Sequence, residues 1–138
     1  MTKEKITVGC PVDLIGLLTP YARKKVEHFG IICLDGAHQL IKVKSLFTGG
    51  YTSSTVDIRV LLFEAIKCRS VSVIIFHNHP SGNTTPSSQD KNTTEEIEKA
   101  LAICGMNLLD SIIIGKYDYF SFVLSGLLHA DIISKDKK

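Results

Sequence analysis

The run of β-branched and aromatic residues at 70–76 restricts the fold of this chain more than any other segment. A strand that is apolar without alternation is typical of a sheet covered on both of its faces. The run is far shorter than the roughly 20 apolar residues that cross a bilayer. It therefore predicts a central strand of a water-soluble domain with layers packed on either side of the sheet.

The remaining segments alternate between strand and helix patterns. Strands are expected at 27–34, 40–47, 107–114 and 117–123, and helices at 57–68 and from Ser87 or Ser88 to about 103. A short helix at 14–18 is expected to begin at Asp13 as its cap and to stop or bend at Pro20. Such alternation predicts one α/β domain whose mixed β-sheet is flanked by helices.

Length and charge narrow the function classes. The 138 residues suffice for a single domain, with a core at about 10–128 and a tail at 129–138. The charged start, with no apolar run behind it, argues against a secretory signal, so we expect a cytoplasmic protein with no membrane span. A net charge of +2 gives no support for nucleic-acid binding. The oligomeric state leaves no signal in the sequence.

The four cysteines show no metal-binding spacing. They stand at Cys10, Cys33, Cys68 and Cys104, with no Cys-x-x-Cys pair, which disfavours a thiolate zinc site or a disulfide framework. Cys33 and Cys104 lie within apolar patterns, and we expect both to be buried as small hydrophobic residues.

Two histidines follow the central strand directly. His77 and His79 are two residues apart, so on extended chain both imidazoles point to the same side. Ten residues separate His79 from Asp90, which lies at the expected start of a helix, from which its carboxylate can project back toward the strand end. Two imidazoles and one carboxylate suit zinc and leave a fourth tetrahedral position open to water. The segment therefore predicts a catalytic zinc site.

Hydrolysis at such a site also needs a proton acceptor and a donor for the oxyanion. Glu27 opens a strand that can lie beside the histidine strand, and Glu64 lies on the preceding helix. Spacing alone leaves both open as the general base. Ser87 is a candidate hydrogen-bond donor to the oxyanion.

Simpler explanations exist for each residue taken singly. Ser87 and Asp90 match a helix capping box, and Glu27 is explained equally well as a solvated charge at a strand edge. Capping, however, gives no reason for paired histidines at the end of a buried strand. The conjunction of the two histidines with Ser87 and Asp90 favours the metal site.

The string HNHPSGNTTPSSQD, from His77 to Asp90, resembles the JAMM (MPN+) metalloprotease signature in the form found in the bacterial RadC family. Segments 26–35, 107–115 and 119–122 resemble other parts of the RadC core domain, so the resemblance covers roughly 10–128. It implies a cytidine-deaminase-like α/β fold and hydrolysis of a peptide or isopeptide bond. It further implies zinc ligands at His77, His79 and Asp90, with Glu27 as general acid/base and Ser87 as stabiliser of the tetrahedral intermediate.

The chain departs from this family at two points. RadC-like chains commonly have histidine where this sequence has Ser111, so a histidine that supports the ligands or faces the substrate is missing. Nothing before Cys10 is long enough for the helix-hairpin-helix region of full-length RadC proteins, so their DNA-repair role transfers poorly. The leading hypothesis is a zinc peptidase or isopeptidase acting on a peptide or protein substrate. A non-catalytic metal-binding interaction module, a DNA-processing factor and a metal-dependent nuclease are the alternatives.

Overall fold

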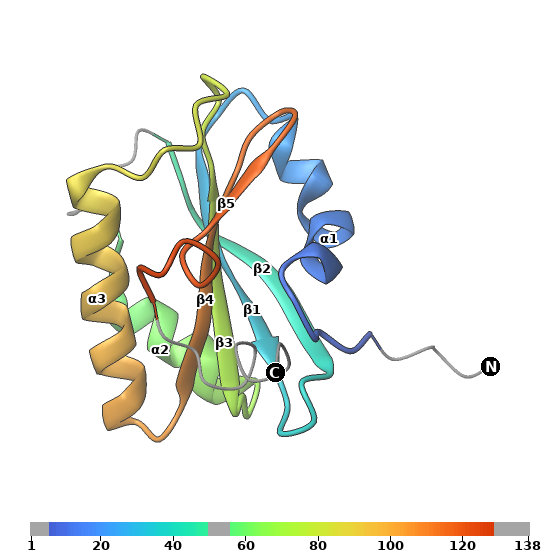
Figure 1. Ribbon diagram of the computed structural model, residues 1–138. Helices are drawn as coiled ribbons and strands as arrows, with labels where there is room; N and C mark the ends of the chain where they lie inside the picture. Colours follow the sequence, from blue (N-terminus) through green and yellow to red (C-terminus); the bar gives the residue numbers. More distant parts are fainter. Residues whose placement is uncertain (1–5, 50–55, 129–138) are drawn as a thin grey trace.

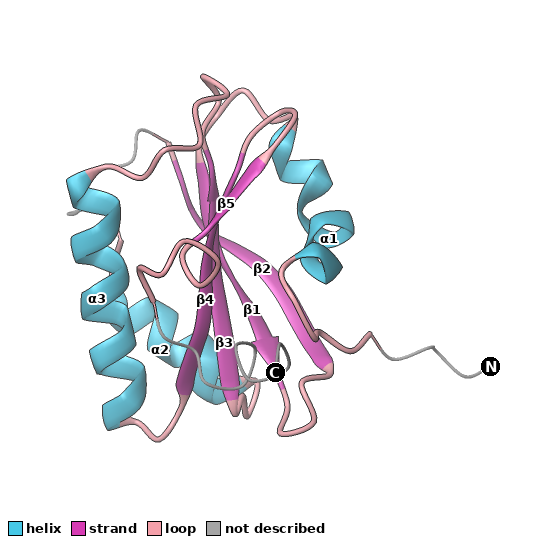
Figure 2. Cartoon of the chain, viewed as in Figure 1, coloured by secondary structure: helices cyan, strands magenta, loops and turns pink. Residues whose placement is uncertain are grey.

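Five strands form one mixed sheet in a computed structural model that describes residues 6–49 and 56–128 (Figures 1 and 2). The strand order is β2-β1-β3-β4-β5, in which β3 is parallel to β4 and every other pair is antiparallel. The strands are β1 (His28–Leu34), β2 (Leu40–Thr48), β3 (Ser72–Asn78), β4 (Asn107–Ile114) and β5 (Tyr119–Ser121). The predicted mixed α/β sheet is confirmed.

Helices cover both faces of the sheet. Figure 1 shows α1 (Val12–Ala22) against one face, and α2 (Ile58–Lys67) and α3 (Ser88–Ile103) against the other. All seven residues of β3 are consequently buried, as the apolar run predicts. None of these helices is long and apolar enough to cross a membrane.

Close packing between β1 and its neighbours depends on Gly30. A Cβ atom there would lie 2.6 Å from Cζ of Phe76 and would also overlap the carbonyl oxygen of Lys44. The Phe76 ring therefore crosses the backbone of β1 at a position that only glycine leaves open. This contact brings β1 and β3 together near the end of the sheet where both histidines lie.

Three expectations from the sequence are wrong. Helix α1 includes Pro20 and ends two residues later at Ala22, so this proline does not stop the helix. Asp13 is not the N-cap: Pro11 occupies that position, and the Asp13 carboxylate accepts hydrogen bonds from the amides of Gly9 and Cys10. Cys104 is exposed, since it caps the end of α3, whereas Cys33 is buried as expected.

The last strand is also shorter than expected. β5 ends at Ser121 because its hydroxyl accepts from the Leu124 amide and its carbonyl from the Ser125 amide, which turns the chain. The predicted loop at 50–55 and the tail at 129–138 lie outside the described residues.

Candidate metal centre

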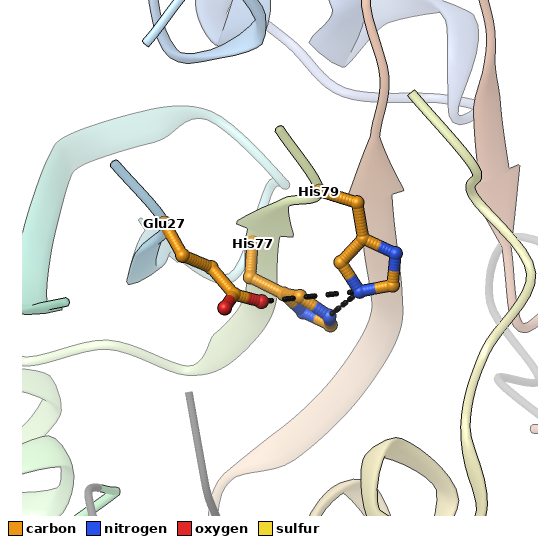
Figure 3. Close-up of side chains that lie close together, drawn as sticks. All are labelled: Glu27, His77 and His79. Atoms are coloured by element: carbon orange, nitrogen blue, oxygen red, sulfur yellow. Dashed lines mark hydrogen bonds and ion pairs between the residues drawn. The ribbon is translucent and has the colours of Figure 1, made fainter. Parts of the chain in front are cut away.

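Glu27, His77 and His79 meet at the end of the sheet where β1 begins and β3 ends. The antiparallel pairing of β1 with β3 ends at Phe29 and His77, and Glu27 and His79 each lie two residues beyond that last pair. The rings of Phe29 and His77 stack with centroids 5.7 Å apart. Figure 3 shows the three polar side chains pointing toward one another, as the sequence predicted for the two imidazoles.

The atoms that face each other are those that bind metals in proteins. His77 Nε2 lies 3.0 Å from His79 Nε2, and His79 Nε2 lies 4.0 Å from a carboxylate oxygen of Glu27. One ligand atom from each of these three residues lies within 4.8 Å of the other two. The cluster could hold a cation.

Asp90 completes the cluster from the first turn of α3. Its Oδ1 lies 3.3 Å from His77 Nε2, and its Oδ2 lies 3.6 Å from His79 Nε2. The side chain is almost fully buried. Burial alone would raise the pKa of Asp90, yet the adjacent His77 and the hydrogen bonds from Ser87 hold that pKa below its ordinary value. Asp90 is therefore a carboxylate at neutral pH.

The same aspartate also caps the helix. Its Oδ2 accepts a hydrogen bond of 2.8 Å from the Ser87 amide, while the Ser87 hydroxyl accepts one of 3.0 Å from the Asp90 amide. This is the capping box that the sequence pattern indicated. Capping uses Oδ2 and leaves Oδ1 directed at His77, so the capping role and a ligand role are compatible in one side chain.

A hydrogen bond to the backbone determines which ring nitrogen of neutral His79 carries the proton. Its Nδ1 lies 2.6 Å from the carbonyl oxygen of Asn83, and a carbonyl can only accept. The proton of neutral His79 is therefore on Nδ1, and Nε2 presents a lone pair to His77 and Asp90. This is the tautomer that a metal ligand requires.

The spacing of the donor atoms is compatible with zinc. Ligand atoms about 2.0–2.2 Å from a tetrahedral zinc ion lie roughly 3.3–3.6 Å from one another. Nε2 of His77 and Nε2 of His79 are 3.0 Å apart, and Asp90 lies 3.3 Å from the first through Oδ1 and 3.6 Å from the second through Oδ2. A carboxylate oxygen of Glu27 lies 4.0 Å from His79 Nε2, at the edge of this group of donor atoms.

The two candidate bases occupy different surroundings. Glu27 lies beside the histidines with its side chain partly accessible. Glu64, in α2, instead forms ion pairs with three lysines, at 3.5 Å from Lys42, 3.3 Å from Lys44 and 3.9 Å from Lys67. Geometry thus brings Glu27, and not Glu64, to the histidine cluster.

Ser87 and Ser111 reach the cluster only through Asp90 or α3. Ser87 is exposed and is joined to Asp90 by the capping box. Ser111 is buried in β4, where its hydroxyl accepts a hydrogen bond of 3.2 Å from Thr94, one helical turn after Asp90. At the position where RadC-like chains commonly have histidine, this chain has a hydroxyl that supports α3.

Two residues of this region carried no signal that sequence reasoning used. Asn83 contributes through its main-chain carbonyl. Every residue has such a carbonyl, so the residue type gives no signal of this role. Asn78 lies between the histidines, is buried, and binds the backbone on both sides of Glu27. Only its place inside the His-x-His motif could have drawn attention to it.

The fold and the cluster define an α/β domain with a candidate metal centre at one end of its sheet. The family model described as RadC-like JAB domain matches residues 8–127. The chain therefore belongs to the RadC-like JAB domain family, as its motif suggested.

Named relatives agree with this assignment. The chain is 40% identical over 125 residues to the UPF0758 protein lwe1562 of Listeria welshimeri, covering 90% of this chain and 56% of the relative. It is 43% identical over 96 residues to a UPF0758 protein of Actinobacillus pleuropneumoniae serotype 5b, covering 70% of this chain and 44% of that relative. The chain thus spans about half the length of these relatives, whose names state no activity.

Proposed function

We propose that this domain is a zinc-dependent hydrolase of the JAMM type that cleaves a peptide or isopeptide bond. One observation carries the proposal: Nε2 of His77 lies 3.0 Å from Nε2 of His79, and the Asp90 carboxylate lies 3.3 Å from the first and 3.6 Å from the second. The Asn83 carbonyl favours the tautomer of His79 that binds metal. Membership of the RadC-like JAB family supports the proposal.

His77, His79 and Asp90 would hold the metal. When bound, zinc would supply Lewis acidity, which acidifies water and polarises a substrate carbonyl. The Asn83 carbonyl fixes the ring of His79, and the Ser87 amide fixes the carboxylate of Asp90, so both are oriented before any ligand arrives.

Glu27 is suited to move the proton. Its carboxylate stands beside the histidines with access to solvent, where it would accept a proton from the attacking water and deliver it to the leaving amine. Ser87 keeps its hydroxyl hydrogen available while its oxygen accepts from the Asp90 amide, so it can donate to the developing oxyanion.

An open pocket of about 440 Å³ leads to this carboxylate. It would give room for substrate beside Glu27, and its wall combines an exposed apolar side chain with a lysine. The lining residues are Lys25, Val26, Glu27, Gly49 and Pro80.

Replacing Glu27 by glutamine separates metal binding from proton transfer. We expect Glu27→Gln to keep about one zinc ion per chain, because the three ligands are untouched, and to lose turnover by a factor of about 10²–10⁴. Metal content by mass spectrometry and hydrolysis of short fluorogenic peptides and lysine-linked isopeptides, with and without a chelator, provide the measurements.

Glu64→Gln is the matched control. It removes a carboxylate whose partners are lysines rather than histidines, so it should lower stability and leave turnover unchanged. Full activity of Glu27→Gln would contradict the assigned base. Wild-type protein that binds zinc and hydrolyses none of these substrates would show a metal-binding module instead, and chelator-sensitive cleavage of DNA alone would show a nuclease.

A further inference from the structure

A buried amide joins the histidine motif to the segment that carries Glu27. Asn78 lies between His77 and His79, and because side chains alternate along a strand it points to the opposite face. It is 1% exposed. Its Oδ1 accepts a hydrogen bond of 2.5 Å from the His28 amide, and its Nδ2 donates one of 3.1 Å to the Val26 carbonyl.

These two hydrogen bonds connect β3 to the segment before β1, beyond the point where the β1–β3 ladder ends. The pairing of β1 with β3 stops at Phe29 and His77, so no strand-to-strand bond of that ladder reaches the backbone around Glu27. On extended chain the Val26 carbonyl and the His28 amide point to one side, and the Glu27 carbonyl points to the other. There the Glu27 carbonyl accepts a hydrogen bond of 3.0 Å from the Gly49 amide. The backbone around Glu27 is thus held by Gly49, the residue after β2, on one side and by Asn78 on the other.

The chemistry of the side chain fits this task closely. One neighbour is an amide that must donate and the other a carbonyl that must accept, so the bridging group needs an acceptor and a donor side by side. A carboxamide has both. An aspartate at 78 would accept from His28 but would set a second oxygen against the Val26 carbonyl.

We propose that Asn78 is a positioning residue that fixes the Glu27 carboxylate relative to His77 and His79. The proposal rests on the function proposed above. The two histidines and Glu27 are about fifty residues apart in sequence, and the Asn78 amide joins their backbones directly. A misplacement of about 1 Å in such a group can lower a rate by roughly 100-fold.

Amide hydrogen exchange tests the anchoring without metal or substrate. In Asn78→Ala the His28 amide loses its acceptor, and we expect it to exchange about ten-fold faster or more, as measured by NMR on the full chain. Val73→Ala is the matched control, because it opens a cavity in the same strand and leaves this amide bonded. Unchanged exchange at His28 in Asn78→Ala would overturn the anchoring.

Cobalt loading tests the position of the carboxylate. With Co²⁺ bound, the side-chain signals of Glu27 and Asp90 should both be broadened in the wild type. In Asn78→Ala we expect the broadening at Glu27 to decrease while that at Asp90 stays. Equal broadening at Glu27 in both proteins would overturn the proposal. Asn78→Asp, which fills the same volume, should behave like the alanine variant and serves in its place if that variant does not fold.

Turnover provides the last measurement. Asn78→Ala and Asn78→Asp should lower kcat by roughly 100-fold and leave KM and zinc content near wild type, whereas Val73→Ala should leave kcat unchanged. Wild-type kcat in a folded, zinc-loaded Asn78→Ala would overturn the proposal. If the wild type hydrolyses nothing, the proposed function fails, while the exchange and cobalt measurements still decide whether Asn78 positions Glu27.

Discussion

Asp90 shows how one side chain serves both the fold and the site. Its Oδ2 accepts from the Ser87 amide at the start of α3, and its Oδ1 faces His77 at 3.3 Å. Oδ1 is buried and receives no hydrogen bond from any described residue. A buried acceptor without a donor is costly, and a cation between Asp90 and the histidines would compensate for it.

Substitutions at both ends of the capping box separate its two roles. Asp90→Asn keeps an oxygen for the Ser87 amide but loses the charge, so the protein should stay folded and lose its zinc. Ser87→Ala removes the hydroxyl that caps α3, so stability should fall by about 0.5–2 kcal/mol while zinc stays bound. Urea unfolding and metal content are the two measurements. Retention of a full equivalent of zinc by Asp90→Asn would exclude Asp90 as a ligand.

The loop between β3 and α3 is held against the end of β4. The His79 amide donates to the Ile114 carbonyl at 3.1 Å, and Gly115 packs directly under the loop. A Cβ at Gly115 would lie 2.7 Å from the Thr84 side chain and 3.1 Å from the Gly82 carbonyl. The loop also carries the Asn83 carbonyl that contacts His79. The packing of the loop against the end of β4 therefore influences the geometry of the cluster.

Gly115→Ala should therefore weaken zinc binding from outside the cluster. The added methyl displaces backbone at Gly82, and through Asn83 it disturbs His79, so we expect affinity to fall by about 10–100-fold. Gly16→Ala is the matched control: no atom lies within 4 Å of the added Cβ, and alanine favours the helix. Competition with a chromophoric chelator measures both affinities. Wild-type affinity in Gly115→Ala would show that the loop does not depend on this contact.

Stability of the whole domain should carry a pH dependence from Asp110. This residue is fully buried in β4, where it accepts hydrogen bonds from the Ser121 hydroxyl and the amides of Ser111 and Val123. Burial raises the pKa of Asp110 to about 6, and the hydrogen bonds offset only part of that effect. Between the unfolded value of 3.8 and about 6, the folded protein therefore binds more protons at this site than the unfolded chain.

It follows that the contribution of Asp110 to stability decreases as pH rises from about 4 to about 6, and is constant above that. The difference in unfolding free energy between wild type and Asp110→Asn isolates this contribution from other titrating groups. We expect the unfolding free energy of the wild type to fall relative to that of Asp110→Asn as pH rises across that interval. Urea unfolding at several pH values measures it. A difference that is flat with pH would contradict the raised pKa.

Much of this protein is determined by its sequence alone. The apolar run before His77 requires a strand covered on both faces, and the capping box from Ser87 to Asp90 starts a helix, because these are local preferences of short segments. The spacing of His77 and His79 places both rings on one side of extended chain. Length and bounds are less well determined where long-range contacts decide them, as the end of β5 shows.

Spacing left Glu27 and Glu64 open as the base and the family resemblance implied Glu27, but only the tertiary structure shows which glutamate lies beside the histidines and what Asn78 contacts. The antiparallel register of β1 with β3 brings Glu27 to the histidines, while the packing of α2 against β2 directs Glu64 to lysines. The ring of His79 contacts the backbone carbonyl of Asn83, and the backbone next to Glu27 is hydrogen-bonded to the Asn78 side chain fifty residues away. Contacts of this kind join segments distant in the chain, and no periodicity or local propensity encodes them.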